Sequence, residues 1–123
     1  MTDAELYKKC QEYGGNARMW SRKFAALLPE VEKRRLYLKY GFYSIYEFAA
    51  KLSGMGRSTV DEVLRTYKKV ENKPLLKAEI EKQGWGKVRA VARLLPIESE
   101  EVLVNLVRTL PKNALEQTAR ELS

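Results

Sequence analysis

The sequence predicts an all-α fold, a compact multi-helix bundle of about eight or nine short helices within a single helical domain. Apolar residues recur three and four positions apart over most of the chain, and no stretch shows the period of two that strands require. Glycine, proline and small polar residues interrupt these stretches at short intervals, where helices end and begin. The length of 123 residues, with 45% hydrophobic and 32% charged, suits one globular domain.

The first predicted helices cover residues 3–13 and the stretch after Asn16, which is placed to cap the second helix. The apolar face of this second helix consists of Met19, Trp20, Phe24, Leu27 and Leu28. Pro29 either closes that helix or begins the next one, which runs from residue 30 to Gly41. Ser44, followed three residues later by Glu47, forms a capping-box pattern that starts a fourth helix.

The remaining predicted helices follow in the same way. A fifth opens at Ser58 and a sixth begins at Pro74 and stops at Gly84. A seventh covers about 87–96, an eighth starts at Ser99 with two acids in its first turn, and a ninth follows Pro111. These elements divide the domain into N-terminal helices (1–43), a helix-turn-helix-like pair (44–70), a second helical hairpin (71–96) and a C-terminal helix pair (97–123).

Positive charge is concentrated in the middle of the chain. The net charge is +7, and the segments 31–60 and 61–93 each carry +4, whereas 1–30 carries +1 and 94–123 carries −2. A local excess of this kind indicates a polyanionic partner, although lysine and arginine also serve simply to keep a protein in solution. DNA is the partner that we expect.

The residue inventory argues against catalysis. The chain has no histidine, which excludes triads and zinc sites that need imidazole, and its acids show no paired-carboxylate or Asp-x-Asp spacing. The single cysteine, Cys10, is expected to be a half-buried helix residue rather than a nucleophile. We therefore expect no enzyme activity, no cofactor and no metal. No apolar run reaches the length of a membrane span and no signal-peptide pattern occurs, so we expect a cytoplasmic protein without membrane contact.

The stretch KLSGMGRSTVDEVL, residues 51–64, has two interpretations that involve DNA. In a helix-turn-helix, Gly54 would turn the backbone, Met55 would be buried, and polar residues at the start of the second helix would reach base edges. In a helix-hairpin-helix, the Gly-Met-Gly core would instead present backbone N–H groups to a DNA phosphate. A second Gly-x-Gly begins 30 residues later, at Gly84. A third interpretation is a tight corner that serves only packing.

The candidate DNA contacts are the polar residues that open the fifth helix and the basic residues around it. They are Lys33, Arg34, Arg35, Arg57, Ser58, Thr59, Arg65, Lys68, Lys69, Lys87, Arg89 and Arg93. The aromatic residues between 37 and 48 could stack on bases, but an aromatic core is the favoured interpretation.

An alternative function belongs to a different class. The C-terminal helices are acidic, and the apolar residues between Val102 and Val107 are more than one narrow stripe needs. These helices could pair with a second copy of the chain or with a partner helix. The chain would then be a protein-interaction or dimerisation module with no nucleic-acid role.

The order of these elements resembles the N-terminal helical region of HNH-endonuclease-like proteins of candidate-phyla bacteria. The resemblance covers about residues 13–122 and rests on a basic helix, the sequence GFYSIYEF at 41–48, a helix pair, a helical hairpin and a helix pair with acidic starts. It implies a DNA-engaging helical domain, the targeting part of an HNH-nuclease-like protein. The histidine-rich nuclease module of such proteins has no counterpart here, and the helical region carries no catalytic residues.

Overall fold

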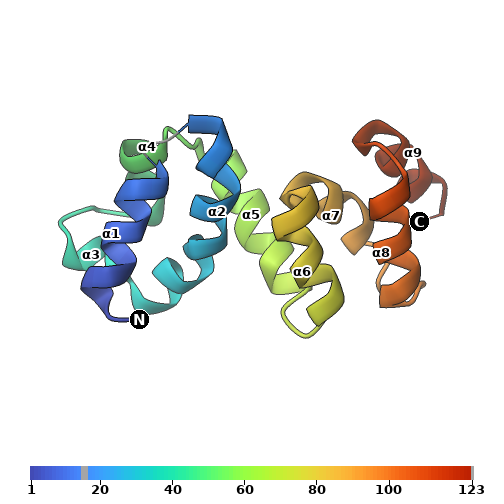
Figure 1. The fold of residues 1–123 in the computed structure, drawn as a ribbon, viewed down its shortest axis with the longest axis horizontal. Coiled ribbons are helices and arrows are strands. Elements are labelled where there is room, and N and C mark those ends of the chain that lie inside the picture. Colours follow the sequence, from blue (N-terminus) through green and yellow to red (C-terminus); the bar gives the residue numbers. More distant parts are fainter. Residues whose placement is uncertain (15–16, 123) are drawn as a thin grey trace. The chain divides into compact units, whose positions relative to one another are not determined.

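The computed structural model describes residues 1–14 and 17–122, and within them it contains nine helices, short connections and no strand (Figure 1). The predicted all-α fold and the expected number of helices are therefore confirmed. The described residues form two compact units, Met1–Leu64 and Arg65–Ser123, whose boundary lies inside helix α5 (Arg57–Lys69). That residues 1–123 fold as a single domain remains a prediction.

The first unit is built on three helices that pack against one another, α1 (Asp3–Gly14), α2 (Ala17–Arg34) and α4 (Ile45–Ser53), with the single turn α3 (Leu36–Lys39) against α2. Phe48, on α4, lies fully buried at the centre of the aromatic cluster. Its ring approaches those of Phe24, Phe42 and Tyr7, with centroids 6.4, 5.3 and 6.2 Å away. The favoured interpretation of these aromatics as core therefore holds for Phe48, whereas Tyr43 is 90% exposed.

The helix end predicted at Pro29 is wrong, because α2 continues through it to Arg34. A proline inside a helix removes one backbone hydrogen bond and costs about 3 kcal/mol. Phe24, Leu28 and Val31 continue one apolar face across the proline, and all three are fully buried. Burial of Val31 beyond the proline favours continuation of the helix. The break comes instead at Arg35, whose φ of 51° is left-handed.

The predicted capping residues of α4 and α8 (Glu100–Thr109) are confirmed. Ser44 Oγ accepts a hydrogen bond from the Glu47 N–H at 3.1 Å, and the Glu47 carboxylate accepts one from the Tyr43 N–H at 3.2 Å. Ser99 Oγ accepts from the Val102 N–H at 3.4 Å. The predicted cap at Asn16 and the side chains of Met19 and Trp20 lie outside the described part of the chain.

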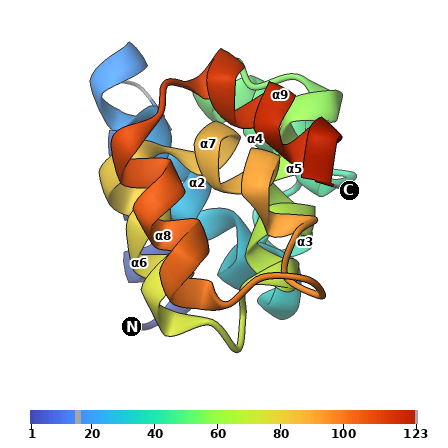
Figure 2. The same ribbon diagram turned by 90° about the vertical axis from the view of Figure 1, so that its right-hand side faces the viewer.

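The second unit contains α6 (Pro74–Gln83), α7 (Trp85–Ala92), α8 and α9 (Lys112–Leu122). Helix α6 packs on α7 and α8, and α7 also packs on α8 and α9; Figure 2 shows α8 beside α6. Helix α7 begins two residues before the predicted start at 87 and ends at Ala92 rather than near 96. In α8, Leu103, Val104 and Val107 are buried, so most of the apolar run considered for dimerisation belongs to the core.

Cys10 is fully buried rather than half-buried, and burial raises the pKa of its thiol to about 12. Because only the thiolate attacks alkylating reagents, we expect Cys10 to react with iodoacetamide about 1,000-fold more slowly than a free cysteine at pH 8. Labelling followed by mass spectrometry, in buffer and in denaturing urea, measures the difference. Labelling in buffer at the rate of the unfolded chain would contradict the buried position.

Candidate nucleic-acid interface

The glycine at the end of α4 closes the helix and turns the chain towards α5. Gly54 has a left-handed φ of 70°, a conformation that glycine adopts without strain. Its N–H donates to the Ala50 carbonyl at 2.9 Å, and the Met55 N–H donates to the Ala49 carbonyl at 3.3 Å. Met55 is only 8% exposed and anchors the turn. The turn therefore has a defined conformation, in which Gly54 turns the backbone and Met55 is buried, as the helix-turn-helix interpretation expects.

Helix α5 begins immediately after this turn. The Val60 N–H donates to the Gly56 carbonyl at 3.1 Å, which makes Gly56 the residue that caps the helix. Glycine has no side chain with which to cap the amides of the first turn, and that turn contains no acid. Arg57 and Ser58 are exposed and Thr59 is half-buried. The start of α5 is thus a positive helix end with small and basic side chains around it.

Tyr46 connects α4 to α5. Its hydroxyl donates to Asp61 Oδ1 at 2.6 Å, and the Arg57 guanidinium lies over its ring, 4.4 Å from the centroid. The hydrogen bond to Asp61 is the main reason why the pKa of Tyr46 is raised. Two consequences follow. Asp61 is engaged within the protein rather than offered to a base, and Arg57 is held at the helix start by a cation–π contact.

The second Gly-x-Gly has a different geometry. Gly84, with φ of 91°, is the only residue between α6 and α7, and Gly86 lies inside the first turn of α7. A Cβ at Gly86 would lie 3.1 Å from the Lys112 ammonium, so that side chain covers this turn. Trp85 between them is half-buried. The two glycine pairs are therefore not equivalent hairpins, and only the first leaves the start of its helix clear of a lysine side chain.

The basic residues predicted on the first unit differ in their surroundings. Lys33 and Arg35 are exposed at the end of α2.

Arg34, between them, is half-buried and hydrogen-bonded within the protein. Its Nε donates to Glu30 at 2.6 Å, and its Nη1 donates to Asp3 at 3.3 Å and to the Met1 carbonyl at 2.9 Å. The bond to Glu30 is the main reason why the pKa of Arg34 is raised. Arg34 therefore fastens the N-terminus to α2, and Lys39 adds a further ion pair to Asp3.

The remaining predicted residues belong to the second unit. Arg65, Lys68 and Lys69 are exposed on the C-terminal part of α5. On α7, Lys87 is half-buried and Arg89 is exposed; Arg89 forms an ion pair with Glu116 at 3.8 Å. Exposed Arg93 caps the C-terminal end of α7. The candidate residues thus lie on separate stretches of the structure: the end of α2, the start of α5, the C-terminal part of α5 and helix α7.

Sequence reasoning missed the contact between Tyr46 and Asp61 and the role of Arg120. Tyr46 and Asp61 are 15 positions apart, and no local pattern marks such a pair. Arg120 lies in the segment with net negative charge, yet it lines the same hollow as Arg89 and Arg93. The sequence signal that could have pointed to Arg120 was spacing. Residues 116 and 120 are four positions apart and share a helix face, as residues 89 and 93 do.

Within the described residues, no three side chains of histidine, cysteine, aspartate or glutamate gather where a metal ion could bind. No helix of this part of the chain combines the length and hydropathy that spanning a membrane requires. No protein-family model, curated protein or solved structure matches the chain. The resemblance to HNH-endonuclease-like proteins therefore remains a prediction.

Proposed function

We propose that this chain is a non-enzymatic DNA-binding helical domain that engages duplex DNA through the pair α4–α5 and the basic residues around it. The observation that carries the proposal is the start of α5. Gly56 has no side chain that could cap the backbone amides of the first turn, and this turn contains Arg57 but no acidic residue. A helix end of this kind favours a phosphate group through its N–H groups and its dipole. The targeting part of an HNH-nuclease-like protein is the setting that the sequence resemblance implies.

Of the two docking modes, the surroundings of α5 favour the one in which backbone N–H groups hold a phosphate. Base reading in the major groove needs free side chains on the first turns of the second helix. In these turns, Asp61 accepts a hydrogen bond from the Tyr46 hydroxyl, and the Arg57 guanidinium lies on the Tyr46 ring. Ser58 is then the exposed polar side chain of the first turn that makes neither contact. Phosphate contacts position a protein on DNA without reading its sequence. We therefore expect little dependence on DNA sequence.

The test is the salt dependence of binding to a labelled random-sequence duplex, measured by fluorescence anisotropy. With ~4–6 phosphate contacts, the plot of log K against log salt should have a slope of about −4 to −5. Affinity should then fall roughly 300- to 1,000-fold between 50 and 200 mM salt. A slope near zero would contradict electrostatic binding. Absence of binding even at 50 mM salt would favour the dimerisation alternative, which a light-scattering mass of twice 14.2 kDa would support.

A further inference from the structure

A hollow of about 230 Å³ lies in the second unit between α7 and α9. Its lining consists of Arg89, Ala90, Arg93, Glu116 and Arg120. A water molecule occupies about 30 Å³ in the liquid, so the hollow has room for a tetrahedral oxyanion together with water. Small Ala90 forms the floor between the two α7 arginines, which keeps the space open.

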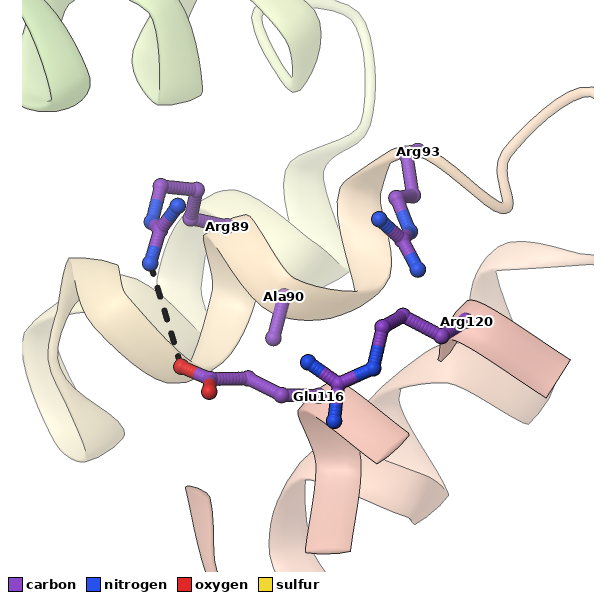
Figure 3. Close-up of a pocket in the computed structure, with 5 residues that line it drawn as sticks. All are labelled: Arg89, Ala90, Arg93, Glu116 and Arg120. Atoms are coloured by element: carbon purple, nitrogen blue, oxygen red, sulfur yellow. Dashed lines mark ion pairs between the residues drawn. The ribbon is translucent and has the colours of Figure 1, made fainter. Parts of the chain in front are cut away.

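The guanidinium groups of Arg93 and Arg120 project from α7 and α9 into the same space, as Figure 3 shows. Arg89 points along the other side towards Glu116, and the ion pair between them measures 3.8 Å. That distance is too long for a hydrogen bond. Glu116 supplies the single carboxylate of the lining.

The lining carries three guanidinium groups and one carboxylate, a net charge of +2. Each arginine lies in the last turn or cap of its helix, where the helix dipole favours a cation. That preference explains each position separately. It does not explain why three guanidinium groups from two helices line one hollow. An anion bound in the hollow would be attracted by all three of them.

We propose that this hollow binds a phosphomonoester dianion, and that its source is the terminal phosphate of a nucleic-acid strand. The proposal rests on the proposed function for the choice of nucleic acid. A phosphomonoester carries about −1.5 to −2 at neutral pH, which matches the lining, whereas an internal phosphodiester carries only about −1. The planar fork of a guanidinium pairs with two phosphate oxygens at once. A concave site also accommodates a group with three free oxygens better than a backbone that must pass through it.

The experiment compares two duplexes of identical sequence, labelled at a 3′ end, with either a phosphate or a hydroxyl at the 5′ ends. At the same salt concentration, the full chain should bind the phosphorylated duplex about tenfold more tightly. Arg93→Gln and Arg120→Gln should each reduce that ratio towards one, and Glu116→Gln should increase it. Lys77→Gln is the matched control, because Lys77 is exposed on α6 outside the hollow and its loss removes the same charge.

The outcomes separate this inference from the proposed function. Equal binding of both duplexes with a steep salt dependence overturns the terminal-phosphate site and leaves DNA binding intact. Absence of binding to either duplex overturns both. Inorganic phosphate, followed by NMR at the arginine Nε–H groups, tests a free anion. Shifts at Arg93 and Arg120 without discrimination between the duplexes assign the hollow to free phosphate and overturn the strand end as its source.

Discussion

Replacement of Ser58 by aspartate is expected to weaken DNA binding about 10- to 100-fold while making the protein more stable. Ser58 is exposed in the first turn of α5, which contains no acid. A carboxylate there complements the helix dipole and should raise stability by about 0.3–1 kcal/mol. The same charge would lie a few ångströms from a phosphate held by the amides of that turn, where repulsion in a partly exposed site is worth about 1–3 kcal/mol. A misfolded variant would be less stable than the wild type. A gain in stability together with a loss of affinity therefore excludes misfolding as the cause of the weaker DNA binding.

The matched control is Ala4→Asp, which adds the same charge to the first turn of α1, also on an exposed position of the first unit. We expect its DNA affinity to stay within about twofold of the wild type, since α1 carries none of the proposed contacts. Thermal melting by circular dichroism gives the stability and anisotropy at fixed salt gives the affinity. If Ser58→Asp binds DNA as tightly as Ala4→Asp, the start of α5 does not hold a phosphate.

Most of the fold was predictable because its signals are local. Ser44 with Glu47, Ser99 with the acids after it, and Pro74 at the start of α6 each set a helix end within a few residues of sequence. The error at Pro29 shows the limit. The local cost of a proline is fixed, but whether it breaks a helix depends on what the following residues bury, and Val31 is fully buried.

The candidate site was predictable only in part. Gly54 and Met55 could be identified because a glycine–apolar–glycine turn needs those residue types at those positions. The contacts that distinguish the possible roles of these residues involve partners distant in sequence. Tyr46 hydrogen-bonds Asp61, 15 positions away, and Arg120 on α9 lines the same hollow as Arg93 at the end of α7. Counting charge along the sequence treats every arginine alike. Only the fold shows that Arg34 is committed to Asp3 and Glu30.

The second unit depends on an ion pair that buries a carboxylate. Glu79 on α6 is 1% exposed, and its Oε1 accepts from Arg108 Nε at 3.0 Å and Nη2 at 2.7 Å. Its Oε2 is buried without a hydrogen-bond partner in the described part of the chain. Breaking such a pair by removing one member is strongly destabilising, because the remaining charge stays buried. Arg108 is 55% exposed, so water moderates the effect.

We expect Arg108→Leu to destabilise the second unit by about 2–4 kcal/mol, a fall in melting temperature of roughly 10–25 °C. Hydrogen exchange of the α6 and α8 amides locates the loss, and circular dichroism measures the melting temperature. Lys77→Leu, which removes an exposed lysine from the same helix as Glu79, should change the melting temperature by no more than about 3 °C.

The double variant Glu79→Leu/Arg108→Leu tests whether the unpaired, buried Glu79 carboxylate causes the loss of stability in Arg108→Leu. A buried ion pair replaced by apolar residues of similar size is often neutral or stabilising, since no charge then remains to be desolvated. The double variant should therefore recover most of the stability that Arg108→Leu loses. Equal instability of the single and the double variant would assign the loss to the packing of the arginine stem on α8. Full recovery would show that Arg108 stabilises the second unit by compensating the buried carboxylate of Glu79.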